Sequence, residues 1–282
     1  MRPQAVPGQG RPSVVVTRPQ PEAHAWVAAL RDRGWPAILL PLLAVTPPAD
    51  AREREALNQA RAGWWRFDAL MFVSGAAVQH FFGDGRLATP SEPAHTRFWA
   101  PGPGTAKALA KALTLAGLAA DRIDSPPPDA PQFDSEHLWP VVSGQMGPGR
   151  RLLLVRGRSA EAQAGELPGS GREWLLRQCQ AAGAEVSACV AYERRVCPLD
   201  ASPRAPWREA VPQGAVWLFS SSESLGALAP LGASADWSRC AALVTHPRIG
   251  QAAQALGFGR VVETRPALDD VLRTLESNTW KP

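Results

Sequence analysis

Short apolar runs alternate along the chain with segments whose apolar residues recur at helical spacing. The first run, residues 13–17, precedes a segment with apolar residues at positions i, i+3, i+4 and i+7, namely Ala23, Trp26, Val27 and Leu30. Similar apolar runs, which predict further strands, occupy residues 69–73, 97–100, 151–155, 215–219 and 241–244. Strands that alternate with helices predict parallel sheets with helical crossovers.

The order of these elements recurs in the second half of the chain. Three strand–turn–helix blocks match three later blocks at a nearly constant spacing of about 140 residues, so that Val16 corresponds to Val155, Ser74 to Ser220 and Pro103 to Pro247. The alternative is the general likeness that α/β units share. We favour a duplication, which predicts an α/β fold with two similar parallel-sheet lobes of flavodoxin-like or Rossmann-like type. We expect the working site in the cleft between them.

Several segments fall outside this repeated pattern. Residues 38–46 and 186–196 are rich in β-forming residues, and we interpret them as a two-stranded β connector between the lobes. Residues 1–12 predict a disordered lead-in without the apolar core of a signal peptide, and residues 165–171 predict a flexible surface insertion. No apolar run approaches the roughly 18 residues that a membrane span needs. We therefore expect a cytoplasmic protein that does not interact with membranes.

The charge of the chain favours a small anionic ligand. The net charge is +4, and lysine occurs only at positions 107, 111 and 281, so the positive charge is almost all arginine. Because the sequence has no basic run and no stripe of arginine and aromatic residues, we do not expect nucleic-acid binding. Arginine binds carboxylates and phosphates well. The alternative is that these arginines only form a solvated surface.

The cysteines and histidines do not have the spacing of a metal site. The four cysteines and five histidines form no CxxC, HxxxH or HExxH pattern. We therefore expect packing roles for the cysteines and no metal site.

Polar residues and glycines follow the predicted strands, where open parallel sheets bind their ligands. The candidate ligand-binding residues are Thr17, Arg18, Ser74, Gly75, Gly102, Gly104, Thr105, Arg156, Gly157, Ser220, Ser221, His246 and Arg248. Four of these turns lead into helices, whose first amides favour anions; the alternative is that the hydroxyls are only N-caps. The GPGTAK segment lacks the spacing of a dinucleotide loop or a P-loop, and no serine-hydrolase elbow is present.

Eight motifs, in order, resemble those of the uroporphyrinogen-III synthase family. They cover nearly the whole chain and read VVVTRP, FDALMFVSGAAV, APGPGTAKAL, DSEHL, RLLLVRG, AGAEVSACVAYER, LFSSSESL and THPRIGQAAQALGF. The resemblance implies an enzyme that cyclises hydroxymethylbilane, a linear tetrapyrrole with eight carboxylates. The substrate loses its hydroxyl as water and ring D is inverted, giving uroporphyrinogen III for haem biosynthesis without a cofactor.

The resemblance also implies how the chain is divided. One lobe would combine residues 13–37 with 197–282, residues 47–185 would form the other, and the two β segments would join them. It further implies that Tyr192, the only tyrosine, donates a proton to the departing hydroxyl or hydrogen-bonds it. The alternative for Tyr192 is a packing role in the connector.

The sequence departs from the family at THPRI, where other members often carry a glycine–threonine loop. We expect His246 or Arg248 to supply the missing donor. The competing function is a non-catalytic two-lobed protein that binds a polycarboxylated small molecule. We expect a monomer in either case.

Overall fold

The computed structural model describes residues 11–20, 22–83, 87–89, 94–160, 170–197, 199, 205–277 and 280, without the side chains of 170–172 and 232–234. The predicted lead-in at 1–12 lies outside these ranges except for its last two residues. The predicted insertion at 165–171 lies outside them up to residue 169, and residues 170 and 171 begin a helix.

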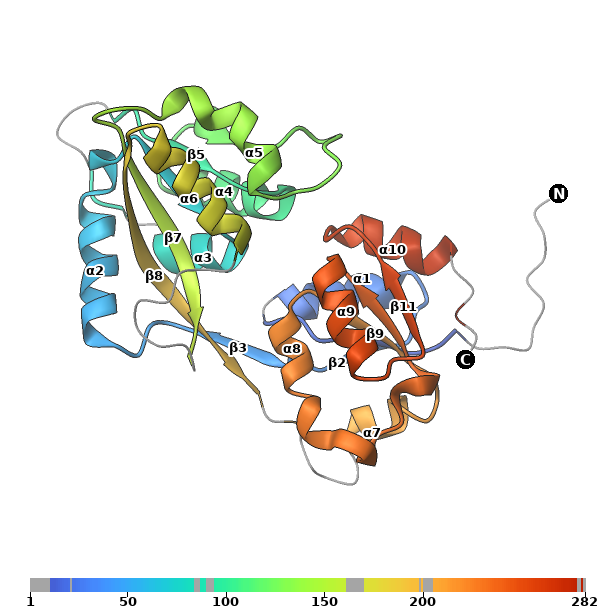
Figure 1. Ribbon diagram of the computed structural model, residues 1–282. Helices are drawn as coiled ribbons and strands as arrows, with labels where there is room; N and C mark the ends of the chain where they lie inside the picture. Colours follow the sequence, from blue (N-terminus) through green and yellow to red (C-terminus); the bar gives the residue numbers. More distant parts are fainter. Residues whose placement is uncertain are drawn as a thin grey trace. The chain divides into compact units, whose positions relative to one another are not determined.

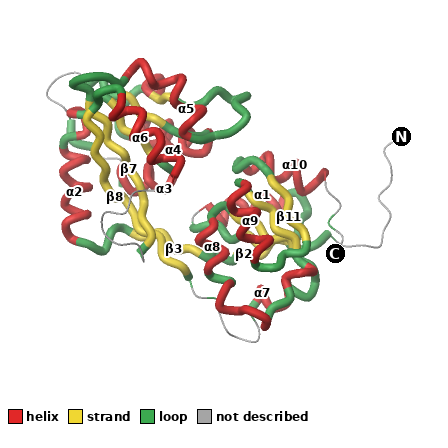
Figure 2. Tube along the Cα trace, in the orientation of Figure 1, coloured by secondary structure: helices red, strands yellow, loops and turns green. Residues whose placement is uncertain are grey.

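The described residues form two sheets flanked by helices (Figures 1 and 2). The five-stranded sheet contains β1 Val14–Val16, β2 Ala37–Leu39, β9 Val216–Phe219, β10 Ala241–Val244 and β11 Arg260–Glu263. The six-stranded sheet contains β3 Leu43–Thr46, β4 Ala69–Phe72, β5 Arg97–Trp99, β6 Ile123–Asp124, β7 Arg151–Ser159 and β8 Glu185–Val196. The α-helices are α1 Glu22–Asp32, α2 Ala51–Ala62, α3 Gly75–Phe82, α4 Pro103–Leu115, α5 Ser135–Val142, α6 Ser170–Ala181, α7 Pro206–Ala210, α8 Ser222–Gly226, α9 Pro247–Ala255 and α10 Leu268–Ser277.

The two sheets share one arrangement of strands. The first has the order β2-β1-β9-β10-β11 and the second has β3-β8-β7-β4-β5-β6. The pairs β1–β2, β1–β9, β9–β10 and β10–β11 are parallel, and so are β7–β8, β4–β7, β4–β5 and β5–β6. Apart from the edge strand β3, β7 and β8 occupy the places that β1 and β2 occupy in the first sheet. The predicted α/β fold with two parallel-sheet lobes is confirmed.

The chain divides into two compact units, which exchange segments between its two halves. Unit 1 consists of residues 1–44 and 196–282, and unit 2 of residues 45–195. The first half of the chain therefore supplies β1 and β2 to one unit and β4 to β6 to the other. The second half supplies β7 and β8 to unit 2 and β9 to β11 to unit 1.

The predicted connector segments are strands of the sheets themselves. Residues 38–46 form two strands, β2 and β3, because residues 40–42, which include Pro41, separate them; proline has no amide hydrogen for the ladder. β2 pairs with β1, whereas β3 lies at the edge of the second sheet. β8 pairs with β7 from Glu185 to Arg194 (Figure 1).

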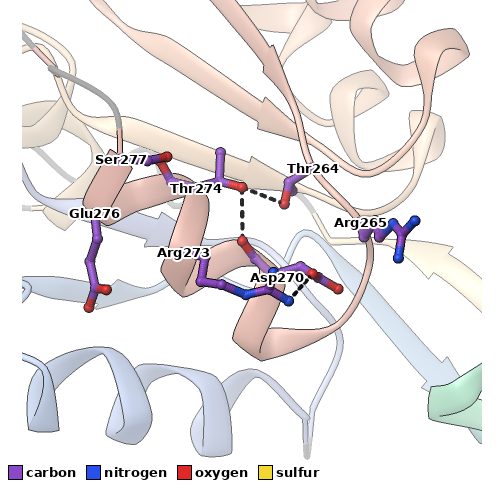
Figure 3. A pocket seen from close by; sticks show the side chains of 7 residues that line it. All are labelled: Thr264, Arg265, Asp270, Arg273, Thr274, Glu276 and Ser277. Carbon is purple, nitrogen blue, oxygen red and sulfur yellow. Dashed lines mark hydrogen bonds and ion pairs between the residues drawn. The ribbon is translucent and has the colours of Figure 1, made fainter. Parts of the chain in front are cut away.

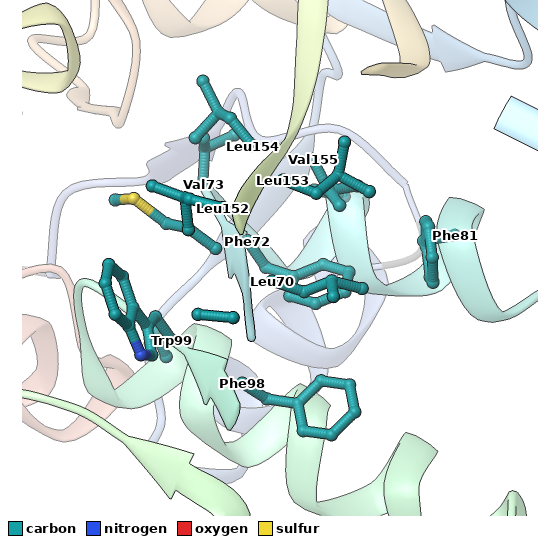
Figure 4. Packing of buried hydrophobic residues seen from close by; sticks show 14 of the residues in the cluster. Leu70, Phe72, Val73, Phe81, Phe98, Trp99, Leu152, Leu153, Leu154 and Val155 are labelled. Atoms are coloured by element: carbon teal, nitrogen blue, oxygen red, sulfur yellow. The ribbon is translucent and has the colours of Figure 1, made fainter. Parts of the chain in front are cut away.

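Apolar side chains cover both faces of each sheet. In β1, Val14 and Val16 belong to one core cluster and Val15 to another, because successive residues of a strand point to opposite faces. The apolar positions predicted for α1 are confirmed: Ala23, Trp26, Val27 and Leu30 are all buried. In unit 2 the central strands β4, β5 and β7 carry the core shown in Figure 4. No helix in the described ranges is both long and apolar enough to cross a membrane.

Candidate active site

The two strand neighbours of β7 bring the predicted tyrosine beside a predicted serine. Phe72 of β4 is in register with Val155 of β7, and Ser74 follows two residues further along, just beyond the end of β4. On the other side of β7, Gly157 is in register with Tyr192 of β8. Gly157 and Tyr192 therefore form a row across β7 and β8, and Ser74 follows the neighbouring strand β4.

A β-bulge sets the position of Tyr192. Arg156 pairs with Val190, but Gly157 pairs with Tyr192, so Ala191 is the extra residue of β8. Because side chains alternate along a strand, this insertion changes which residue of β8 lies over Gly157. The bulge directs the tyrosine ring across the glycine.

Tyr192 is held over Gly157 by close contact and by a hydrogen bond. A Cβ built on Gly157 would lie 2.3 Å from the ring atom Cζ of Tyr192, so only glycine leaves room for the ring. The Oη of Tyr192 lies 3.0 Å from the Oγ of Ser74, within hydrogen-bond distance. Tyr192 is only 4% exposed. The residue is thus almost entirely buried, and the contact with Ser74 fixes the position of its hydroxyl.

Ser74 connects this hydroxyl to a helix. It is the N-cap of α3, and its Oγ accepts a hydrogen bond from the amide of Ala77 at 3.2 Å. Gly75 is the first residue of α3. The amides of a first helical turn carry partial positive charge, which favours electron density on the oxygen that they contact. A chain of hydrogen bonds therefore runs from the start of α3 through Ser74 to Tyr192.

His80 stacks on Tyr192 and was not predicted as a site residue. The two ring centroids are 5.7 Å apart with an interplanar angle of 30°. Burial lowers the pKa of His80, and the positive charge of Arg61 lowers it further. The guanidinium of Arg194 lies 5.9 Å from the centroid of the tyrosine ring. His80 lies six residues after Ser74 in the same helical segment, but sequence spacing alone does not show that its ring reaches β8.

An ion network lies beside the row on β7. Arg158 donates to Glu193 at 2.8 Å and to Glu53 of α2 at 3.0 Å. Glu193, whose side chain is 2% exposed, also accepts from the amide of Ala49 at 2.9 Å. Arg156, two residues before Arg158, is only 9% exposed. Within the described ranges its Nε has no hydrogen-bond partner.

The start of α4 offers free amides. Gly102 is its N-cap and supplies no side-chain acceptor, so among the described residues the amides of Gly104 and Thr105 have neither an intrahelical nor a capping partner. A Cβ on Gly104 would meet nothing within 4 Å, which leaves this turn open, whereas Thr105 is buried. Anion binding at this turn stays a prediction.

Thr17 and Arg18 in unit 1 are engaged within the protein. Thr17 is fully buried, and its hydroxyl donates to the carbonyl of Leu218 at 2.6 Å. Its side chain therefore serves the core, contrary to the expectation of a ligand contact. The guanidinium of Arg18 is paired with Glu22 at 2.8 Å and lies 4.3 Å from the ring centroid of Trp26. A ligand carboxylate would have to compete with Glu22.

The remaining predicted residues of unit 1 lie at the starts of α8 and α9. Ser220 follows β9, and Ser221 is the N-cap of α8, where its Oγ accepts from the amide of Glu223. His246 is the N-cap of α9, and its Nδ1 accepts from the amide of Arg248 at 3.1 Å. The imidazole therefore presents Nε2 to solvent. Both His246 and Arg248 are exposed.

A shallow hollow of about 550 Å³ is lined by none of these residues. It is lined by residues that follow β11 and by residues of α10: Thr264, Arg265, Asp270, Arg273, Thr274, Glu276 and Ser277 (Figure 3). Arg273 is paired with Asp270 and Thr264 with Thr274, so the polar groups of the hollow largely satisfy one another. The part of the chain that the structure describes holds no group of three or more His, Cys, Asp or Glu suited to a metal ion.

Comparison with known proteins yields one consistent family. The family model described as "Uroporphyrinogen-III synthase HemD" matches residues 24–273. A uroporphyrinogen-III synthase of Salmonella typhimurium is 29% identical over 271 residues, which cover 94% of this chain and 100% of the relative. A uroporphyrinogen-III synthase of Escherichia coli is 28% identical over 270 residues, with the same coverage.

Solved structures show the same fold. The crystal structure of uroporphyrinogen-III synthetase from Helicobacter pylori has a TM-score of 0.52 at 14% identity, covering 94% of this chain and 99% of that one. A mutant uroporphyrinogen III synthase from Thermus thermophilus has a TM-score of 0.50 at 18% identity, covering 94% and 97%.

Proposed function

The chain belongs to the uroporphyrinogen-III synthase family, and on that premise we propose how its residues carry out the reaction. The enzyme, a lyase of tetrapyrrole biosynthesis, converts hydroxymethylbilane into uroporphyrinogen III. The reaction removes the terminal hydroxyl as water, inverts ring D and closes the ring. The comparisons do not favour the alternative of a binding protein without catalysis.

The proposed role of Tyr192 rests on its hydrogen bond to Ser74. When the Ser74 hydroxyl donates to the Oη of Tyr192, the phenolic proton is free to be donated to the departing hydroxyl, directly or through one water. As that proton leaves, the serine and the start of α3 stabilise the negative charge on the phenolic oxygen. The leaving group departs as water, and the tetrapyrrole is left as a cation.

The carboxylates of the substrate position it. In unit 2 we assign them to Arg156 and to the free amides of Gly104 and Thr105. Arg248 and the Nε2 of His246 in unit 1 stay predicted carboxylate donors. Donors of this kind hold a linear tetrapyrrole in one folded shape, and this orientation favours closure after ring inversion over direct closure. We further propose a monomer, because Tyr192 and Ser74 come from one chain, and we propose the cytoplasm as its location.

Turnover tests the function directly. Freshly made hydroxymethylbilane is incubated with the protein, the products are oxidised, and the porphyrin isomers are separated by chromatography. We expect isomer III in large excess, and the same result after exhaustive dialysis against EDTA. If isomer I predominates, as it does in buffer alone, the protein is not a synthase.

Removal of a single oxygen atom, the Oη of Tyr192, tests the role of this residue. Tyr192→Phe keeps the ring that packs on Gly157 and stacks on His80, and removes only the hydroxyl. We expect kcat to fall about 100-fold, as for loss of a general acid, with little change in the unfolding midpoint. Normal kcat in the variant would assign Tyr192 to packing alone.

A further inference from the structure

Arg156 is a buried cation whose nearby acids are already paired. Its side chain lies on β7 one residue before Gly157, and the residue is 9% exposed. Among the described residues it makes no hydrogen bond or ion pair, and its Nε is buried without a partner. An isolated charge in such a position destabilises the folded protein unless a counter-charge is supplied.

The surroundings supply only part of that counter-charge. Glu53 and Glu193 both bind Arg158, which lies two residues further along the same strand. Arg194 adds another positive charge close by. Burial lowers the pKa of Arg156, and the charges of Arg158 and Arg194 lower it further, against the opposing effect of Glu53. The local balance is therefore positive, with Arg156 as the cation that no acid pairs.

The other two candidate arginines differ from Arg156 in this respect. The Nη1 of Arg18 is also buried without a hydrogen-bond partner among the described residues, but Glu22 pairs with this guanidinium at 2.8 Å. Arg248 is exposed, so water solvates its charge in the free protein. Neither of them needs a ligand to compensate a buried charge. Arg156 does.

We infer that Arg156 is the receptor for one carboxylate of the substrate, and that this ion pair forms only in the complex. The inference rests on the proposed function, because it takes the ligand to be a polycarboxylate. A guanidinium binds a carboxylate through two parallel hydrogen bonds, which orient the ligand as well as attract it. The free protein is consequently less stable than it would be with an apolar residue at this position.

The experiment compares Arg156→Met with Arg158→Met as a matched control on the same strand. Thermal unfolding is followed with and without uroporphyrin III, the oxidised octacarboxylate form of the product. We expect Arg156→Met to raise the Tm of the free protein by about 2–4 °C, because an unpaired charge is removed. Arg158→Met should lower it, since Glu53 and Glu193 lose their partner.

Ligand binding provides the second measurement. We expect Arg156→Met to lose most of the rise in Tm that uroporphyrin III causes, and to raise KM about 10- to 100-fold while isomer III remains the product. Arg156→Lys keeps the charge but cannot form the two parallel hydrogen bonds of a guanidinium, so its KM should be intermediate. This variant also tests the inference if Arg156→Met does not fold. A lowered Tm with unchanged KM and ligand effect for Arg156→Met, or a wild-type KM for Arg156→Lys, overturns the inference.

The two proposals fail separately. If wild-type protein yields only isomer I, the synthase function is lost, yet a rise in Tm with uroporphyrin III that depends on Arg156 still supports a carboxylate receptor. If wild-type protein makes isomer III and Arg156 variants bind normally, only the receptor is refuted.

Discussion

Gly157→Ala should displace the ring of Tyr192 from its place over residue 157. The added Cβ would lie 2.3, 2.4 and 2.7 Å from Cζ, Cε2 and Cε1 of the ring, whereas ordinary contact begins at 3.4 Å. The ring would therefore have to move by about 1 Å, and hydrogen bonds weaken beyond about 3.5 Å. The present distance of 3.0 Å to Ser74 leaves no margin for such a shift.

The cost has two components. Overpacking of a close-packed interior costs about 1–3 kcal/mol, and loss of the hydrogen bond between the two hydroxyls costs about 1 kcal/mol. We therefore expect Gly157→Ala to lower the free energy of unfolding by about 2–4 kcal/mol. Since the phenolic oxygen is displaced, kcat should fall about as far as in Tyr192→Phe.

Urea unfolding and steady-state turnover measure these two effects. Gly144→Ala is the control, because a Cβ there would meet nothing within 4 Å; its stability should stay within about 0.5 kcal/mol of wild type. In the double variant Gly157→Ala/Tyr192→Phe, kcat should be no lower than in Gly157→Ala alone. Multiplicative losses of kcat, or a fully active Gly157→Ala, would refute the reasoning.

Three further predictions concern buried groups. Glu193→Gln should lower the free energy of unfolding by about 3 kcal/mol, because the charge opposite Arg158 is lost from a buried network; an unchanged urea midpoint would contradict this. Because the folded state holds His80 with a lowered pKa, the unfolded chain binds more protons below about pH 6.5. The Tm should therefore fall as pH decreases through that window, and less so in His80→Phe; equal slopes would exclude this coupling. Burial raises the pKa of Cys189 to about 12. At pH 8 iodoacetamide should therefore modify the partly exposed Cys197, and should modify Cys189 only after the protein unfolds. Modification of Cys189 in the native protein, detected by mass spectrometry, would contradict this.

Local patterns of the sequence predict the elements of the fold. Apolar runs identify the central strands, and the i, i+3, i+4, i+7 pattern identifies the buried face of α1. Such local patterns do not predict how the strands pair, because β1 pairs with β9, about 200 residues away along the chain. Only the resemblance to a known family implied that the halves exchange segments. The interruption at Pro41 was missed, although proline is a signal against a continuous strand.

The candidate site was predictable only in part. The apolar run of β4 predicted that Ser74 follows a strand, but not that it bonds to Tyr192, because that bond depends on an extra residue in β8 that no local pattern reveals. Thr17 also follows a strand, yet its hydroxyl turns to a core carbonyl. The pairing of Arg18 with Glu22 had no such signal, because Arg18 lies before α1, which begins at Glu22.

The exchange of segments between the two halves also affects how the chain folds during synthesis. Unit 2 is continuous, so all its strands have left the ribosome once β8 is made. Unit 1 has to wait, since Val14 pairs with Val216. At 5–20 residues per second, this interval lasts about 10–40 s. Throughout it, the apolar strand β1 lacks its partner β9, and this earliest-made segment is the one that a chaperone would protect.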